Sequence, residues 1–143
     1  MIGRTVSLTW LCLALLLGAV DPGNDREKIQ GTWVVARSER DGAPIPSDEL
    51  RGKQVRLVFR GGEVQARMGD KLTSLGTFTL DPAALPKGYD RVYPDGTPRL
   101  GIYQLDGDTL MICFGGIGKE RPSAFATKPG DGASLVVYRR ETP

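Results

Sequence analysis

Apolar and polar residues alternate over several short stretches of the chain. The clearest alternations cover residues 54–60, 63–68, 77–80, 110–114 and 135–137. A period of two places the apolar side chains on one face of an extended strand. The pattern therefore predicts antiparallel strands with one face on a core and the other in water.

Glycine and proline interrupt the chain too often for helices of ordinary length. After residue 20 the longest stretches without either residue are ten residues long, at 32–41 and 133–142. Gly61-Gly62 indicates a tight hairpin, and Asp106-Gly107 predicts a type I′ turn. Single helical turns fit after Ser47 and after Asp81-Pro82. We expect an all-β fold of eight or nine short strands with one or two single-turn helices, as a barrel or a sandwich.

The first twenty residues differ from the rest. Arg4 precedes an uncharged, leucine-rich run from Thr5 to Val20, and small residues come before an abrupt polar turn. This order is typical of a secretory signal peptide. The run is shorter than the roughly 20 residues of a membrane span, so we favour cleavage over an uncleaved anchor, which would be the only link to a membrane. We assign residues 1–20 to the signal peptide, 21–27 to a flexible polar leader and 28–141 to a single domain.

Composition narrows the chemistry further. The chain of 143 residues has no histidine, and cleavage would leave Cys113 as its one thiol. This excludes histidine-dependent triads, histidine metal ligands and cysteine redox pairs. The net charge is +2, and the basic residues interleave with acids, so nothing indicates a nucleic-acid partner. We interpret these arginines as solvated outer faces: Arg37, Arg40, Arg51, Arg56, Arg60, Arg67 and Arg91.

An ordered series of motifs resembles a known family. The series comprises Gln30-Gly31-Thr32-Trp33, Asp41-Gly42, the run 101–110 with Cys113, and Arg121-Pro122 with Phe125. It is similar to the small lipocalin-like domain family found in many copies in planctomycetes, over about residues 28–140. The two most specific segments are Asp106-Gly107-Asp108-Thr109-Leu110 and Arg121-Pro122. The resemblance implies a small up-and-down antiparallel barrel and carries over no catalytic residue.

The lipocalin signature also implies roles for particular side chains. In Gly31-x-Trp33 the tryptophan would plug the closed end of the barrel, and a basic residue of the last strand, Arg139 or Arg140, would lie across its ring. The remaining positions come from strand phase and loop composition. Candidate interior residues are Val35, Leu57, Phe59, Phe78, Leu110, Ile112 and Phe125. Candidate rim aromatics at an opening are Tyr89, Tyr93 and Tyr103.

Three candidate sites have simpler explanations. Residues 115–119 contain a Gly-Lys pair but lack two of the four elements of a phosphate loop. Asp106 and Asp108 fit hairpin chemistry better than calcium. Nothing places Asp90 opposite Asp95 as a glycosidase pair. We therefore predict no enzyme, no cofactor and no metal site.

Two questions stay open from the sequence: the role of the Cys113 thiol and the function of the domain. The strand phase of Cys113 matches Met111, which places the thiol on the outer face under a loop, and we favour an inert thiol in a monomer over a Cys113-linked dimer. The leading hypothesis is an exported binding module, periplasmic or extracellular, that holds a small apolar ligand or a protein partner at the open end of the barrel. The alternative is a structural or interaction domain whose barrel is filled by side chains.

Overall fold

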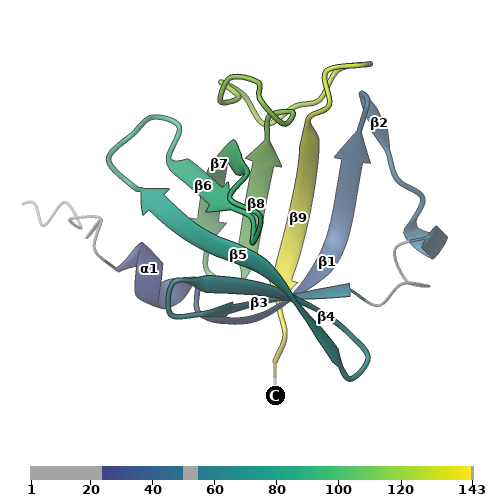
Figure 1. The fold of residues 1–143 in the computed structure, drawn as a ribbon. Coiled ribbons are helices and arrows are strands. Elements are labelled where there is room, and N and C mark those ends of the chain that lie inside the picture. The colour runs from purple at the N-terminus through teal and green to yellow at the C-terminus, as the bar shows by residue number, and fades with distance from the viewer. Residues whose placement is uncertain (1–23, 50–54, 143) are drawn as a thin grey trace, which may run out of the picture.

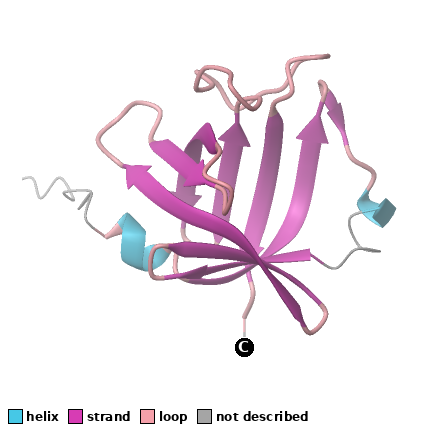
Figure 2. Cartoon of the chain, viewed as in Figure 1, coloured by secondary structure: helices cyan, strands magenta, loops and turns pink. Residues whose placement is uncertain are grey.

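The computed structural model describes residues 24–49 and 55–142. A short helix, α1 (Asp25–Lys28), precedes nine strands, and residues 47–49 are also helical (Figure 2). The strands are β1 (Gly31–Arg40), β2 (Ala43–Pro44), β3 (Val55–Arg60), β4 (Glu63–Met68), β5 (Lys71–Asp81), β6 (Gly88–Val92), β7 (Pro98–Asp106), β8 (Thr109–Phe114) and β9 (Ser134–Arg140). The expected all-β class is confirmed.

The strands form one closed antiparallel barrel. Strands β1 and β3 to β9 pair in chain order, and β9 returns to β1, with Trp33 opposite Arg140 and Arg40 opposite Ser134. The short β2 adds to β1 outside the closed ring of eight. Closure leaves no free edge in the ring, so the barrel is the correct alternative and the sandwich is not.

The two ends of the barrel differ in what covers them. We call the end with α1, the start of β1 and the hairpin turns at 61–62 and 107–108 the helix end. We call the opposite end, with residues 93–97 and the long β8–β9 loop at 115–133, the loop end. Figure 1 shows α1 beside the β3–β4 hairpin and the β8–β9 loop at the far end of the strands.

The hairpin turns partly follow the prediction. Arg60 pairs with Glu63, so Gly61-Gly62 forms the expected two-residue turn. The next prediction is wrong by one residue: Asp106 pairs with Thr109, and the turn is Gly107-Asp108. Among the described residues only Gly107 of this pair has a positive φ, of 56°, so the turn is not type I′. Gly107, the first residue of the turn, adopts the left-handed conformation, and Asp108 does not.

Inward-facing side chains form a packed core that extends from Ile29 and Trp33 at the helix end to Phe114 at the end of β8. Its largest members are aromatic, and Phe59, Phe78 and Tyr89 contact one another through their rings. The buried members are Ile29, Trp33, Leu57, Phe59, Val64, Phe78, Tyr89, Tyr103, Leu110, Ile112 and Phe114. Five of the seven predicted interior residues are among them.

Several side chains lie elsewhere than expected. Phe125 is not inside the barrel: it packs on the outer face against Ile102, Cys113 and Leu135, because it belongs to the β8–β9 loop and has no place in the strand alternation. Val35 lies on the inner face but is only half-buried. Tyr89 and Tyr103 are not rim residues, since they are 0% and 1% exposed. Their strands carry them inward.

Gly101 lets the aromatic core close across three strands. It pairs with Tyr89 on β6 and with Phe114 on β8. A Cβ at this position would lie 2.8 Å from the Cys113 carbonyl oxygen and 2.9 Å from the Phe114 ring. Its absence allows the two rings to meet edge to face, with centroids 5.3 Å apart.

The folded domain begins earlier than the sequence indicated. Of the predicted flexible leader, residues 24–27 belong to the folded structure, with Asn24 as the cap of α1. Asp25 is 5% exposed. Its carboxylate finds partners across the barrel end, which is why a polar stretch is ordered here. The predicted signal peptide, and residues 21–23, lie outside the described residues.

Candidate functional site

The signature tryptophan lies at the helix end. Trp33 is fully buried, and its indole Nε1–H donates to the Ile29 carbonyl oxygen at 2.8 Å. The Arg140 guanidinium lies 4.3 Å from the centre of the indole ring. Arg139 is exposed, so Arg140 is the residue that covers Trp33. Gly31, at φ 110°, lies beside the same guanidinium and brings the chain into β1.

Every nitrogen of the Arg140 guanidinium has an acceptor. Nε donates to the Asp108 carboxylate at 3.2 Å, and Nη1 donates to the Gln30 carbonyl oxygen at 2.9 Å. Nη2 donates to the Lys28 carbonyl oxygen, one of the unpaired carbonyls at the end of α1. The contacts join α1, β1, β9 and the Gly107-Asp108 turn. This arrangement is a structural clamp.

A second polar cluster fixes α1 to the barrel. The Asp25 carboxylate accepts from Lys87 Nζ at 2.8 Å and from the Tyr103 hydroxyl at 2.7 Å. Burial alone would raise the pKa of Asp25, but these two donors outweigh it, and the pKa is below its usual value. The pKa of Tyr103 is raised by burial and by this hydrogen bond, so the hydroxyl stays a donor. One Asp25 oxygen, Oδ2, thus accepts from both donors and links α1 to Lys87 and to β7.

The loop end holds a different kind of cation. Arg91 on β6 is 6% exposed and opposite Phe78, and its guanidinium lies 4.9 Å from the centre of the Phe114 ring. Nη2 donates to the Tyr89 hydroxyl at 3.1 Å. Nε is buried without a hydrogen-bond partner. The interpretation of Arg91 as a solvated outer-face residue is therefore wrong, because its strand phase is that of inward-facing Tyr89.

Three tyrosines interact electrostatically with this arginine: Tyr89, Tyr93 and Tyr138. Burial is the main cause that raises the pKa of Tyr89, and burial also raises the pKa of Tyr138 to about 12. Burial by itself would lower the pKa of Arg91, but Tyr89, Tyr138 and Tyr93 offset it, and the net shift is upward. The tyrosines thus remain neutral and the guanidinium charged at physiological pH.

Arg99 lies on β7 opposite Arg91, at the loop end of the barrel. Its guanidinium lies on the same Phe114 ring, also 4.9 Å from its centre. Nε donates to the Gly115 carbonyl oxygen at 2.9 Å, and Nη2 is within 3.3 Å of the Gly132 carbonyl oxygen and of the Ser134 hydroxyl. Arg99 therefore ties together the two ends of the β8–β9 loop. Its hydrogen bonds give it a structural role that Arg91 lacks.

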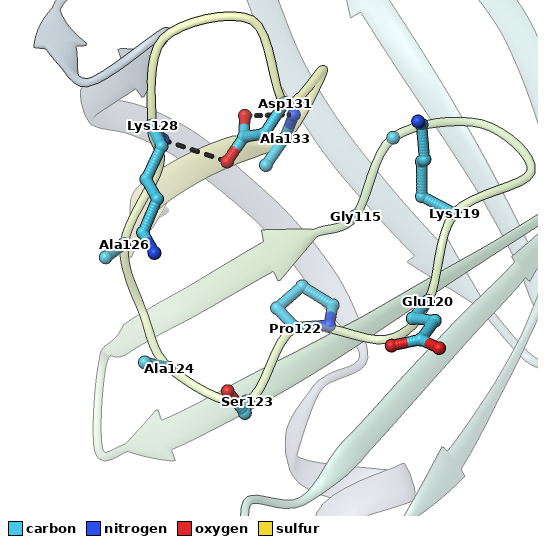
Figure 3. A pocket seen from close by; sticks show the side chains of 11 residues that line it. Gly115, Lys119, Glu120, Pro122, Ser123, Ala124, Ala126, Lys128, Asp131 and Ala133 are labelled. Carbon is cyan, nitrogen blue, oxygen red and sulfur yellow. Dashed lines mark hydrogen bonds between the residues drawn. The ribbon is translucent and has the colours of Figure 1, made fainter.

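The β8–β9 loop encloses a pocket of its own. The pocket has a volume of about 500 Å³, and all its lining residues come from 115–133. Figure 3 shows Lys119 and Lys128 on opposite sides of the loop, with Asp131 between the chain segments. Both Asp131 oxygens accept from backbone N–H groups, of Lys128 and Ala133. The carboxylate is therefore a loop brace and not a free reactive group.

The glycines of this loop serve close backbone approach. A Cβ on Gly115 would lie 2.4 Å from the Glu120 carbonyl oxygen, and one on Gly116 would lie 2.8 Å from the Asp131 carbonyl oxygen. Lys119 N donates to the Gly116 carbonyl oxygen, which closes a turn. Close backbone packing within the loop therefore accounts for Gly115 and Gly116.

Cys113 lies on the outer face of β8 beneath the β8–β9 loop, as its phase indicated. It is fully buried, and its sulfur lies 3.7 Å from the Ala126 carbonyl oxygen. Burial raises the pKa of the thiol. Both effects lower its reactivity toward disulfide formation.

The carboxylates considered from the sequence are not brought together. Asp90 forms an ion pair with Arg121, and Asp95 accepts from the backbone N–H of Thr97. Asp106 ends β7, and Asp108 lies in the hairpin turn and forms an ion pair with Arg140. Within residues 24–49 and 55–142 no group of acidic or cysteine side chains has the arrangement of a metal site. In the same part of the chain, no helix is long and apolar enough to cross a membrane.

Sequence reasoning missed Arg91 and Tyr138. Both have a readable signal: Arg91 lies two positions after Tyr89, and Tyr138 two positions before Arg140, so each shares the inward phase of its neighbour. Tyr93, the third rim candidate, is half-buried at the loop end. The chain matches no protein-family model, and neither the curated proteins nor the solved structures contain a significant match.

Proposed function

We propose that this protein is an exported, non-enzymatic binding module that holds a small, largely apolar ligand inside the loop end of its barrel. The barrel fold is compatible with such a role. The observation that carries the proposal is the buried Arg91, whose Nε has no hydrogen-bond partner although Nη2 donates to the Tyr89 hydroxyl. Buried polar atoms without a hydrogen-bond partner are rare in native structures, and a bound ligand would supply the missing acceptor.

The inner surface of the barrel also supports ligand binding. Toward the helix end it is filled by the aromatic core. On the inner face of β1 and β9, Val35, Val136 and Tyr138 are only half-buried, although Leu110 and Ile112 on the neighbouring β8 are fully covered. Apolar surface thus remains accessible on the inner face of β1 and β9, which is what an apolar ligand needs.

The second candidate is a structural or interaction domain without a ligand. It is favoured by the packed core, in which Trp33, Tyr89 and Tyr103 are all at most 1% exposed. A barrel of eight strands is just wide enough for side chains to fill. In this alternative the β8–β9 loop, with its exposed Lys119 and Ile117, would be the surface that meets a partner.

Export and a monomeric state belong to the same proposal. Export rests on the residue pattern at 1–20, and membership of the planctomycete lipocalin-like family rests on the motif series. The monomer is supported by the burial of Cys113, since a disulfide between chains would require the β8–β9 loop to move away. A non-reducing gel of the purified protein should show a single band at monomer size.

Native mass spectrometry tests the ligand directly. Protein purified from its own host is expected to carry a small molecule that is released on unfolding and to take up a hydrophobic dye once emptied. Protein that is repeatedly empty and excludes the dye would contradict ligand binding and favour the structural alternative. The mass of the mature chain in the same spectra tests cleavage near residue 20.

A further inference from the structure

Arg91 indicates which chemical class of ligand the barrel takes. Its guanidinium is charged and buried, and none of the ion pairs among the described residues includes it. A buried charge without a counter-ion is costly, and proteins ordinarily pair it. A ligand with one negative charge would therefore supply the counter-ion that the Arg91 guanidinium lacks.

We propose that the loop-end interior binds an amphipathic monocarboxylate, with Arg91 as the anchor of its carboxylate. The inference rests on the proposed function and names the ligand class of that same site. The apolar part of the ligand would lie against the half-buried inner faces of Val35 and Val136.

The geometry of the guanidinium fits a carboxylate. The free donor is Nε, and the neighbouring Nη2 donates to the Tyr89 hydroxyl. Because Tyr89 uses its oxygen as the acceptor in that bond, its own proton is left for a further acceptor. An oxygen that accepts from both Arg91 Nε and the Tyr89 hydroxyl would satisfy two buried donors at once, a charge-assisted arrangement.

The number of charges favours a singly charged group. Two guanidinium groups lie over the Phe114 ring, and of these two Arg91 has no hydrogen bond to the backbone, whereas Arg99 donates to the Gly115 and Gly132 carbonyl oxygens. A carboxylate balances a single cation. A doubly charged phosphate would leave an excess negative charge among Phe78, Phe114 and the tyrosines, where charge is poorly solvated.

Calorimetric titration with three probes of equal chain length tests the proposal: dodecanoate, dodecanol and dodecyltrimethylammonium, each below its aggregation concentration. The purified protein is expected to bind dodecanoate best and the cation worst. In Arg91→Met the dodecanoate affinity should fall about ten- to hundredfold, to the level of dodecanol. Arg139→Met removes a cation from the exposed face of β9 and should leave dodecanoate binding unchanged.

The outcomes separate the two proposals. Equal affinities for dodecanoate and dodecanol, or an unchanged dodecanoate affinity in Arg91→Met, would overturn the carboxylate inference while the ligand-binding function stands. Failure of all three probes, together with empty protein in native mass spectrometry, would overturn both. If Arg91→Met does not fold, Arg91→Lys serves instead: it keeps the charge but loses the planar donor pair, and a reduced dodecanoate affinity with unchanged dodecanol affinity is expected.

Discussion

Two arginines lie over aromatic rings at opposite ends of this barrel. At the helix end Arg140 lies 4.3 Å from the centre of the Trp33 ring, and toward the loop end Arg91 lies 4.9 Å from the centre of the Phe114 ring. All three Arg140 nitrogens donate hydrogen bonds. Arg91 donates one, to Tyr89, and its Nε has none.

The difference separates stability from function. A guanidinium with every donor paired stabilises the elements that it joins. A buried guanidinium with an unpaired donor lowers stability, so its retention needs another reason. The helix end is therefore where we expect mutations to unfold the protein, and the loop end is where we expect them to change binding.

The largest expected effect is at Trp33. Trp33→Ala should lower the free energy of unfolding by about 3–5 kcal/mol, because it empties the centre of the helix-end core and removes the hydrogen bond to Ile29. Urea denaturation measures the loss. Val34→Ala, at the next and partly exposed position of β1, is the control and should cost about 1 kcal/mol or less. Similar losses for the two variants would contradict the helix-end core.

Asp25 tests the second helix-end cluster. Asp25→Ala should cost about 2–3 kcal/mol at neutral pH, because Lys87 and the buried Tyr103 hydroxyl lose their acceptor.

The same residue gives a pH dependence. The pKa of Asp25 is lowered in the folded chain from its ordinary 3.8, so the unfolded chain binds more protons in acid. Its stabilisation is complete above pH 3.8 and is lost as the pH falls toward the folded pKa. Denaturation curves from pH 7 to pH 2 should converge for the wild type and Asp25→Ala. A constant difference down to pH 2 would rule this out.

Gly101 tests the packing that joins the two ends. Gly101→Ala should cost about 1–3 kcal/mol, because the added methyl meets the Cys113 carbonyl oxygen and the Phe114 ring. Thermal unfolding measures the loss. Gly107→Ala is a useful comparison, since its Cβ would meet nothing and only its φ of 56° is strained. Full stability of Gly101→Ala would mean that the aromatic rings do not need this gap.

The fold followed from the sequence better than the site did. Period-two alternation predicted that Leu57, Phe59 and Ile112 lie on the apolar faces of their strands. The resemblance to lipocalin-like domains predicted that these faces point into a barrel. Burial of Tyr89 and Tyr103 was missed because glycine and proline around them resembled a loop rim. Arg91 was predicted to face solvent because its side chain is charged. Its position two residues after Tyr89 in β6 instead places it on the same, inward face. The two partners of Asp25, Lys87 and Tyr103, are 62 and 78 residues away in the sequence, so no local pattern reveals them.

The central claim is that Arg140 stabilises the barrel and Arg91 does not. Chemical denaturation of Arg140→Met and Arg91→Met, with Arg139→Met as the exposed control, tests it most directly. Arg140→Met should lose about 1–3 kcal/mol with the indole contact and the hydrogen bonds to Lys28 and Gln30. Arg91→Met should be unchanged or more stable by about 1 kcal/mol. A loss in Arg91→Met as large as that in Arg140→Met would contradict the account.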